Sequence, residues 1–371
     1  MKPNSRWIFA AWVVVANVAA CKSVTDSSVV SGLEDADRLW AGGSAVCART
    51  TSGLKCFGSN ETKAVEVRPI KIDGVGRVST VAMSVGQACA VDEQGVVCFS
   101  TIPLDGKSVR RTDLIKPTNV VNLGMVGRDR FCATDANGLA CWKELNAPSE
   151  HVPDTGLPEQ MLASLVGDAL CLEEGGNLTC YTLEGSGALT PTFTVKGVHG
   201  VKQVSADTIS GKLVFLDDTG LKWAQVQTLT LRGNPFGYVN PLEVPADVAP
   251  VRGAVVTARP VEGLGVVRGF SSYSIWSYVL DDSGLKKLDI RFDGAHLEPV
   301  ALERVPEGMW GGKDSVVFLK QGPSLMMTGW SNGKRIEGNV AGIRLPRDVA
   351  AGLFFTCVAH DGGVSCVKNP E

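Results

Sequence analysis

Ten of the eleven cysteines in this 371-residue chain form five pairs, and the members of every pair stand nine positions apart. The pairs are Cys47 with Cys56, Cys89 with Cys98, Cys132 with Cys141, Cys171 with Cys180, and Cys357 with Cys366. A spacing that recurs in this way is not produced by chance, and an even set at fixed spacing is typical of disulfides. A zinc site is disfavoured because each pair stands alone, without a second knuckle that would complete the ligands. Redox catalysis is disfavoured because it uses a CxxC motif beside a βαβ unit.

The residues between the two cysteines of a pair predict a tight β-hairpin. The middle four positions are polar and turn-forming, and a glycine stands at the seventh place as Gly53, Gly95, Gly138 and Gly363. Asn177 takes that place in the fourth segment, and asparagine is the next best residue for a left-handed conformation. A type I turn closed by one residue of positive φ brings the two cysteines directly opposite each other on neighbouring strands. Closing a loop of about ten residues contributes roughly 2.7 kcal/mol in the chain-entropy model.

The hairpin pattern continues where the cysteines stop. Three further copies are Val214–Trp223, Tyr278–Lys287 and the weaker Phe318–Met327. An aspartate precedes the turn in several copies, at Asp92, Asp135, Asp217 and Asp281. Its carboxylate can accept hydrogen bonds from turn amides. The hairpins recur about every 41 residues, which is typical of propeller blades and not of a helical solenoid. We therefore expect an all-β fold, a β-propeller of seven or eight blades over 38–371, with an insertion at about 226–265.

The N-terminus resembles a bacterial secretory signal. Lys2 and Arg6 precede Trp7–Ala20, which is apolar except for Asn17. As a helix this stretch reaches about 21 Å, too short to span about 30 Å of bilayer hydrocarbon. It fits the apolar core of a signal peptide that is removed after export.

The residue that follows is the one cysteine without a partner, Cys21. The sequence Val-Ala-Ala-Cys that ends there resembles the lipobox of bacterial lipoproteins, with Val where Leu is usual. The resemblance implies cleavage before Cys21, diacylglycerol on its sulfur and an acyl chain on the new amino group. Lys22, not aspartate, comes next, which resembles sorting to the outer membrane. We expect a lipoprotein signal peptide at 1–20 and a flexible tether at 21–37; an ordinary cleavage site is the alternative.

The repeats resemble those of the regulator of chromosome condensation family, also called alpha-tubulin suppressor-like repeats. The segment Cys56-Phe57-Gly58-Ser59-Asn60 is a good copy of the family consensus Cys-Trp-Gly-x-Asn, and Cys141-Trp142 is a partial one. The resemblance covers about 38–368, although the Gly-Gln-Leu-Gly that follows in the consensus is missing throughout. It implies a propeller, commonly of seven blades, whose first and last repeats share a blade. The nucleotide-exchange activity of the nuclear member is not implied here, whereas secreted bacterial members resemble binding scaffolds.

The sequence favours binding over catalysis. The four histidines are scattered, at His151, His199, His296 and His360. His360 replaces the turn aspartate of its repeat, so we expect it to be a turn residue. The chain has no P-loop or His-Glu-x-x-His motif, and its one Gly-x-Ser-x-Gly segment, at 329–333, falls in a partial copy of the repeat. We expect no cofactor or metal. The repeated aspartates stand at successive hairpin tips, whereas paired carboxylate catalysis needs two of them within about 5–10 Å.

A protein is the partner that these patterns favour. The net charge is −3 without a cluster of basic residues, which argues against nucleic acid. The insertion offers Phe236 and Tyr238 as candidate binding residues, although an extended edge strand with a loop explains it equally well. We expect a scaffold without catalytic activity, anchored to the bacterial outer membrane, that binds an envelope or extracellular protein. A hydrolase or lyase acting on cell-envelope glycans or peptides, and a purely structural role, are the alternatives.

Overall fold

Each disulfide-linked hairpin forms as predicted, with the two cysteines directly opposite each other. In the first hairpin Cys47 pairs with Cys56, and the strands continue in register to Thr50 opposite Gly53. The Cα atoms of the five cysteine pairs are 3.9–4.1 Å apart. None of the five disulfides joins two sheets, and the hairpin register deduced from the spacing is thereby confirmed. They link Cys47 to Cys56, Cys89 to Cys98, Cys132 to Cys141, Cys171 to Cys180, and Cys357 to Cys366.

These hairpins become the middle strands of small sheets in the computed structural model. The structure describes residues 27–42, 45–58, 68–84, 86–102, 104, 106–107, 109–111, 122–126, 130–135, 138–142, 150–151, 161–162, 169–183, 189–207, 212–225, 254–273, 276–291, 294–311, 316–331, 334–352 and 355–369. Within these residues there are eight sheets, each of which we call a blade. No helix among them is long and apolar enough to cross a membrane.

The blades follow the chain in order, each running from an inner to an outer strand. Blade 1 consists of β2 (Arg38–Gly42), β3 (Ala45–Thr50), β4 (Gly53–Gly58) and β5 (Ile70–Lys71). Blade 2 consists of β6 (Thr80–Met83), β7 (Gln87–Asp92), β8 (Gly95–Ser100) and β9 (Val109–Arg111). Blade 3 consists of β10 (Asn122–Val126), β11 (Arg130–Asp135), β12 (Gly138–Trp142) and β13 (Glu150–His151). Blade 4 consists of β14 (Met161–Leu162), β15 (Ala169–Glu174), β16 (Asn177–Leu183), β17 (Leu189–Lys196) and the added strand β21 (Ala254–Thr257). Blade 5 consists of β18 (Gln203–Asp207), β19 (Lys212–Asp217), β20 (Gly220–Gln225) and β22 (Arg259–Pro260). Blade 6 consists of β23 (Val267–Tyr273), β24 (Trp276–Asp281), β25 (Gly284–Arg291) and β26 (Gly294–Pro299). Blade 7 consists of β27 (Gly308–Gly311), β28 (Val316–Gln321), β29 (Ser324–Ser331) and β30 (Lys334–Asn339). Blade 8 consists of β31 (Asp348–Ala351), β32 (Phe355–His360), β33 (Gly363–Lys368) and β1 (Ser28–Val30).

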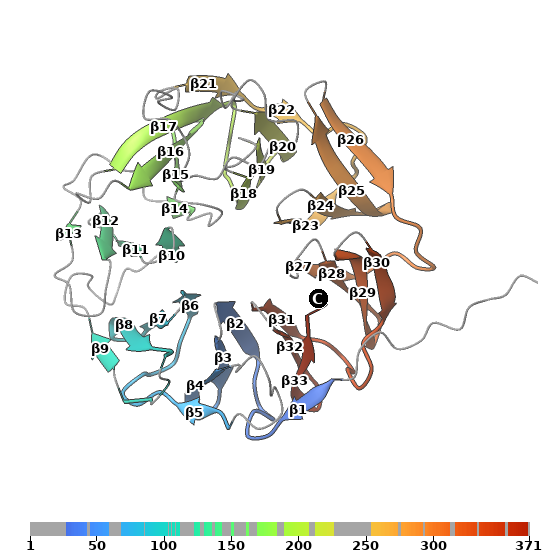
Figure 1. Cartoon of the computed structure of the whole chain (residues 1–371). Coiled ribbons are helices and arrows are strands. Elements are labelled where there is room, and N and C mark those ends of the chain that lie inside the picture. Colours follow the sequence, from blue (N-terminus) through green and yellow to red (C-terminus); the bar gives the residue numbers. More distant parts are fainter. Residues whose placement is uncertain are drawn as a thin grey trace, which may run out of the picture.

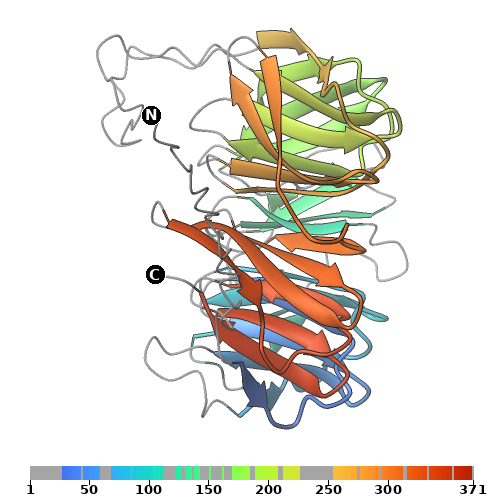
Figure 2. The same ribbon diagram turned by 90° about the vertical axis from the view of Figure 1, so that its right-hand side faces the viewer.

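The blades stand around a central axis and form a propeller (Figure 1), which Figure 2 shows from the side. The alternatives of seven and eight blades are thus resolved as eight. Because each blade packs against a neighbour on both faces, its middle strands are apolar on both faces; in β7 and β8 every residue from Ala88 to Val91 and from Val96 to Phe99 is buried. The core accordingly consists of clusters between adjoining blades, such as the cluster of Val97 and Phe99 with Leu54.

The inner strands use small residues because they approach one another near the axis. A side chain at Gly42, the last residue of β2, would collide with the backbone and Cβ of Met83 at the end of β6. Glycine at this position therefore lets two neighbouring inner strands come together.

The turn of blade 4 differs from the prediction. Asn177 is not among the described residues with positive φ; instead Gly175 and Gly176 have φ values of 56° and 81°. Two successive central residues of positive φ are typical of a type I′ hairpin turn, for which glycine pairs are favoured. The two glycines thus remove any need for a left-handed Asn177, and the register that places Cys171 opposite Cys180 is preserved.

The last blade is closed by the N-terminal part of the chain. β1 pairs with β33, with Ser28 opposite Cys366 and Val30 opposite Val364. Val30, Leu33 and Ala36 are buried in the cluster between blades 8 and 1. Residues 28–37 thus belong to the propeller and not to the flexible tether expected at 21–37, because their apolar side chains complete the core of the closing blade.

Residues 254–260 serve two blades at once. β21 pairs in parallel with β17 of blade 4, while β22 pairs with β20 of blade 5. The guanidinium carbon of Arg259 lies 5.3 Å from the centroid of the Trp223 ring, a cation–π contact at this junction. The insertion expected at 226–265 therefore ends earlier, since residues 254–265 are part of the propeller; 226–253 lie outside the described residues.

Candidate functional site

Two kinds of connection meet on one face of the ring, which we call the turn face. They are the turns between the second and third strands of a blade, and the loops that lead from one blade to the inner strand of the next. In blade 2 the turn and the incoming loop are joined by the backbone N–H of Arg77, which donates to Glu93 Oε2 at 2.8 Å. The turn face is therefore a layer of interlocked connections.

The repeated aspartate is what ties these connections together. Asp281 accepts hydrogen bonds from the N–H of Ser283 in its own turn (2.9 Å) and from the N–H of Gly265 in the incoming loop (2.9 Å). Lys286 lies with its Nζ 2.6 Å from Asp281 Oδ2, and it also donates to the carbonyl of Gly263 at 3.0 Å. One carboxylate and one ammonium thus hold three pieces of chain, an arrangement that we call the Asp clasp.

Blade 5 repeats the clasp with the same spacing. Asp217 accepts from the N–H of Thr219 at 2.8 Å and of His199 at 3.2 Å. Lys222 Nζ lies 2.7 Å from Asp217 Oδ2 and donates to the carbonyl of Gly197 at 2.7 Å. Blades 5 and 6 therefore use the same four groups around the aspartate: an N–H of the turn, an N–H of the incoming loop, a lysine, and a loop carbonyl that accepts from that lysine.

Blade 2 builds the clasp with an arginine from its outer strand. Asp92 accepts from the N–H groups of Gln94 and Gly76, each at 2.9 Å. Arg111 of β9 donates to both carboxylate oxygens, at 2.9 and 2.6 Å, and to the carbonyl of Gly74 at 2.6 Å. The bidentate guanidinium does here what an ammonium does in blades 5 and 6.

The electrostatics of the clasps keep the three carboxylates ionised. Their side chains are fully buried, at 0% exposure. Burial by itself raises the pKa of Asp281, but the hydrogen bonds from Lys286, Gly265 and Ser283 outweigh it, so the pKa lies well below the usual range. The pKa values of Asp92 and Asp217 are lowered for the same reasons. Buried, ionised and saturated with donors, these groups hold loops in place and are not available for proton transfer to a substrate.

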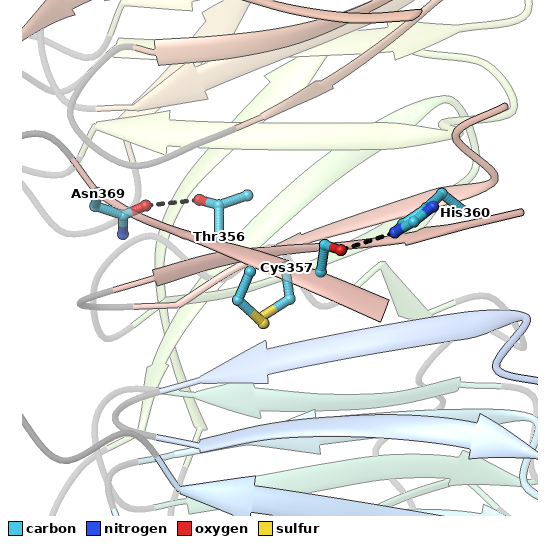
Figure 3. Close-up of a disulfide and its surroundings, with 6 residues drawn as sticks. Thr356, Cys357, His360 and Asn369 are labelled. Carbon is cyan, nitrogen blue, oxygen red and sulfur yellow. Dashed lines mark hydrogen bonds between the residues drawn. A yellow bond between two sulfur atoms is a disulfide. The ribbon is translucent and has the colours of Figure 1, made fainter. Parts of the chain in front are cut away.

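Blade 8 carries a neutral version of the clasp (Figure 3). His360 Nδ1 accepts from the N–H of Gly362 at 3.1 Å, so the ring proton resides on Nε2, which donates to Ser365 Oγ at 2.8 Å. Burial lowers the pKa of His360. Ser365 is fully buried, so a substrate cannot reach its hydroxyl. The prediction that His360 takes the place of the turn aspartate is confirmed.

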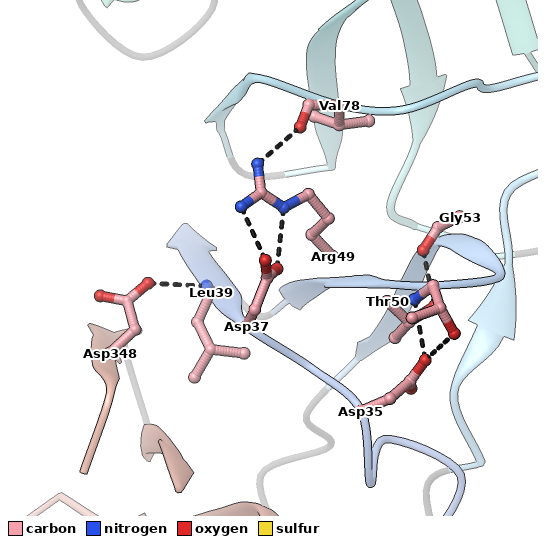
Figure 4. A network of polar contacts seen from close by, with 9 residues as sticks. Asp35, Asp37, Leu39, Arg49, Thr50, Gly53, Val78 and Asp348 are labelled. Carbon is pink, nitrogen blue, oxygen red and sulfur yellow. Dashed lines mark hydrogen bonds and ion pairs between the residues drawn. The ribbon is translucent and has the colours of Figure 1, made fainter.

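A second polar network joins blades 8, 1 and 2 (Figure 4). Arg49 donates to both carboxylate oxygens of Asp37, each at 2.8 Å, and to the carbonyl of Val78 in the next blade at 3.1 Å. Asp348 Oδ2 accepts from the N–H of Leu39 at 2.8 Å, which links the inner strands of blades 8 and 1. Burial raises the pKa of Asp348, whereas Arg49 lowers the pKa of Asp37.

Of the side chains singled out in the sequence, the structure brings together the ten paired cysteines, each within its own hairpin. Cys21, Phe236 and Tyr238 lie outside the described residues. Within the described part of the chain, no group of three or more His, Cys, Asp and Glu side chains is placed to hold a metal ion. His199 is exposed in the loop before blade 5, and its backbone N–H, not its imidazole ring, donates to Asp217.

The paired cysteines contribute to the core and not to an accessible site. Cys98 is 4% exposed and packs in the cluster between blades 2 and 3, and Cys180 is fully buried in the cluster between blades 4 and 5. Their partners Cys89 and Cys171 lie in the same two clusters. Because both sulfurs of each bond are covered, these disulfides have a structural role and do not present a thiol to a substrate.

The cations of the clasps were missed by sequence reasoning, although a signal for them exists. A lysine stands eight positions after the start of three hairpins, as Lys55, Lys222 and Lys286. In blade 1, where the aspartate is replaced by Thr50, Lys55 Nζ still donates to the carbonyl of Gly32 at 2.9 Å. A lysine five residues after a turn aspartate would therefore have predicted the ion pair.

Comparison with known proteins gives no family. No family model matches the chain, and no curated protein matches it. Among solved structures, the chain is similar to PorZ, a surface component of the type-IX secretion system of Porphyromonas gingivalis, with 14% identity and a TM-score of 0.47 over 93% of this chain. The chain spans only 39% of that protein.

Two further solved structures are similar over most of both chains. Prp20p of Saccharomyces cerevisiae has 14% identity and a TM-score of 0.45, over 90% of this chain and 82% of that one. An inactive variant of virginiamycin B lyase of Staphylococcus aureus has 10% identity and a TM-score of 0.44, over 93% and 99%. Likeness at this level concerns the fold alone, because one fold hosts many functions. Membership of the regulator of chromosome condensation family stays a prediction.

Proposed function

We propose that this protein is a lipid-anchored, extracytoplasmic β-propeller that binds a partner protein of the cell envelope or its surroundings and has no catalytic activity. In this proposal residues 1–20 are a signal peptide, Cys21 carries the lipid, and the propeller is a divergent member of the family that its repeats resemble. The outer membrane is the proposed site of anchoring.

The disulfides support the location. Five of them are present, and disulfides of this kind persist in oxidising compartments outside the cytoplasm. The remaining cysteine, Cys21, directly follows the apolar N-terminal stretch. An odd cysteine at that place has a ready use as the site of lipid attachment.

The observation that carries the binding role is that the buried aspartates and the buried histidine hold the connections of the ring in place. The aspartate and histidine residues buried in the described part of the chain are Asp92, Asp217, Asp281 and His360. Each of them holds a turn or a loop through hydrogen bonds. These buried polar groups therefore make the connections rigid. A rigid ring of variable connections is a surface preorganised for binding, and preorganisation lowers the entropy lost on association.

Replacement of Cys21 tests the anchor. We expect Cys21→Ser to release the protein from the membrane fraction, since stable anchoring takes two or more acyl chains and the variant carries none. The measurement is partition between membrane and soluble fractions, with the five disulfides checked as a control for folding. A variant that stays with the membrane as the unaltered protein does contradicts lipidation.

A pair of variants tests the binding role. Deletion of 230–245 is expected to weaken capture of the partner by crosslinking in intact cells, because Phe236 and Tyr238 are the aromatic anchors that the insertion offers. Phe236→Ala with Tyr238→Ala is expected to do the same, whereas Val255→Ala, at an exposed aliphatic near the same segment, leaves capture unchanged. Capture that resists both changes moves the binding surface elsewhere. Saturable cleavage of envelope glycans or peptides by the purified protein contradicts the absence of catalysis.

A further inference from the structure

Three consecutive blades expose an aliphatic side chain at the same loop position on the turn face. The inner strands of blades 6, 7 and 8 are placed by the pairing of Gly269 with Leu280, Gly308 with Lys320, and Asp348 with Ala359. Three residues before each inner-strand member stand Val266, Val305 and Leu345. Their exposures are 72%, 48% and 49%. We call these three residues the aliphatic arc, because blades 6, 7 and 8 adjoin one another around the ring (Figure 1).

The same position is not aliphatic in the other blades where the register defines it. The inner-strand residues that correspond to Gly269, Gly308 and Asp348 in blades 1, 2 and 5 are Arg38, Thr80 and Gln203. Three residues before them stand Asp35, Arg77 and Gly200, respectively. The fold thus does not require an aliphatic residue there. The residue that follows in blades 7 and 8, Pro306 and Pro346, is buried, so the backbone around the exposed side chain is anchored while the side chain itself faces water.

Leu345 is held outward at a conformational cost. Its φ is 50°, and it is the one residue other than glycine with positive φ in the part of the chain that the structure describes. This left-handed region is unfavourable for a side chain such as leucine, and strain of this kind clusters at functional sites. The backbone N–H of Leu345 donates to the carbonyl of Pro323 at 2.7 Å, which holds the loop against the turn of blade 7.

Exposed arginines flank the arc. Arg268, Arg304 and Arg344 each lie within two residues of an arc residue and are exposed. Guanidinium groups pair with phosphate oxygens, while aliphatic side chains enter the boundary between headgroups and acyl chains. The exposed carboxylates of Glu262 and Glu303 lie in the same loops, so attraction here depends on apolar insertion and local arginine–phosphate pairing and not on net charge.

The chain that precedes the propeller brings this loop close to a membrane. Ser27, the first described residue, donates through Oγ to the carbonyl of Ala341 at 2.6 Å. Ala341 lies between β30 and β31, in the same connection as Leu345. The six Cα–Cα steps from Cys21 to Ser27 span at most about 21 Å when the chain is fully extended. A lipid on Cys21 would therefore confine the connection of Leu345 to the neighbourhood of the bilayer surface, at high effective concentration.

We propose that the aliphatic arc is a membrane-docking surface that rests the turn face of blades 6 to 8 on the bilayer into which Cys21 is anchored. This inference rests on the proposed lipid anchor. It assigns an orientation: the turn face lies against the lipid headgroups, and the opposite face, at which β20 ends and β21 begins, points away from them.

Photocrosslinking to lipid tests the orientation. The full-length lipidated protein is inserted into vesicles of phosphatidylethanolamine and phosphatidylglycerol with radiolabelled acyl chains, carrying p-benzoylphenylalanine in place of Leu345, of Val305 or, as matched control, of Ile102. Ile102 is also an exposed aliphatic residue, but it follows β8 on the opposite face. We expect several-fold more lipid attached at positions 345 and 305 than at 102. Two arc positions are used so that a local disturbance at the left-handed position 345 does not decide the result.

Membrane partition in the same samples separates the two proposals. If the protein does not associate with membranes any better than the Cys21→Ser variant, the anchor itself is wrong and the docking surface falls with it. If the protein is anchored but lipid attaches equally at 345, 305 and 102, the orientation alone is overturned. Crosslinking of the arc to another protein molecule in place of lipid also overturns it, and identifies the arc as a protein interface.

Discussion

Single buried carboxylates connect a hairpin turn to the loop that leads into the same blade. Asp281 contacts Gly265 in the incoming loop, Ser283 in its own turn and Lys286 on the next strand. A buried charge is stable only when it is paired and saturated with hydrogen bonds, and removal of one partner leaves the other desolvated and unpaired. In this propeller the buried charge therefore holds the loop that arrives from the preceding blade against the turn of its own blade.

Loss of the blade 6 clasp is expected to be costly. Asp281→Ala leaves the ammonium of Lys286 without its carboxylate partner and two backbone amides without an acceptor, and we expect it to lower the free energy of unfolding by about 3–5 kcal/mol. Asp282, the next residue, is exposed in the turn, and Asp282→Ala is expected to change stability by about 0.5 kcal/mol or less. Urea unfolding of both variants measures the difference. Equal effects of the two substitutions would contradict the structural role assigned to Asp281.

The histidine clasp of blade 8 predicts sensitivity to mild acid. The pKa of His360 in the folded protein is lowered from 6.5 because the ring is buried. The unfolded chain then binds the proton more tightly, so the contribution of His360 is fully present above about pH 6.5 and declines as the pH falls toward the lowered folded pKa. His360→Asn keeps an acceptor for Gly362 and a donor for Ser365 but does not titrate.

We expect the midpoint of thermal unfolding to fall more steeply between pH 7 and pH 5 in the unaltered protein than in His360→Asn. Parallel pH profiles for the two proteins would show that protonation of His360 is not coupled to stability. The aspartate clasps titrate in a different range, because their pKa values are lowered and their contribution is lost only as the pH falls below the usual aspartate value of 3.8.

The disulfide-linked hairpin is the element from which this protein is built. In blades 1 to 4 and 8 it is crosslinked, whereas in blades 5 to 7 the same hairpin forms without cysteine. Val214 pairs with Trp223 and Tyr278 pairs with Lys287 at the positions that the cysteines hold elsewhere. The hairpin thus depends on its turn and on packing against adjoining blades, and the disulfide adds stability to an element that forms without it.

Peptide mapping without reduction is expected to find five ten-residue loops. The reason is that each pair is directly opposed within one hairpin, so that intrablade bonds form first and leave no thiol for exchange between blades. A linkage between blades, such as Cys56 to Cys89 or Cys98 to Cys132, would contradict the register. Replacing Cys357 and Cys366 together by alanine is expected to cost about 2.7 kcal/mol in the chain-entropy model, which equilibrium unfolding measures.

The whole molecule is a closed ring because its two ends share a blade. Blade 8 takes three strands from the C-terminal part of the chain and β1 from the N-terminal part. In the part of the chain that the structure describes, the core clusters lie between neighbouring blades, so closure covers the broad faces of blades 8 and 1 as well. The bridge of residues 254–260 between blades 4 and 5 adds a second connection of this long-range kind.

Closure is tested by two adjacent valines of β1. Val30 is 8% exposed and packs into the cluster between blades 8 and 1, whereas Val29 is 65% exposed. Val30→Asp buries an unpaired charge, and we expect it to lower the free energy of unfolding by about 2–4 kcal/mol, with Val29→Asp close to neutral. Thermal unfolding with detection by circular dichroism compares them. If both variants melt like the unaltered protein, β1 is not needed to close the ring.

The sequence by itself determined the hairpins, their register and their assembly into a propeller. These are local properties: a turn, two strands and a crosslink lie within ten residues, and the repeat makes each copy confirm the others. The turn of blade 4 shows the limit of this reasoning, because Asn177 was assigned a conformation that the preceding glycine pair supplies.

Only the tertiary structure decided how many blades there are, which segment closes the ring, and what the aspartates do. Residues 28–37 read as a polar tether, yet Val30, Leu33 and Ala36 find an apolar surface on blade 8 that lies more than three hundred residues away along the chain. Asp281 was recognised as a turn residue, and Lys286 follows it in the same hairpin, but the contact of Asp281 with the N–H of Gly265 depends on how the loop from blade 5 lies over the turn of blade 6. Such contacts depend on which surfaces meet after the chain has closed on itself, and no local pattern of residues encodes that meeting.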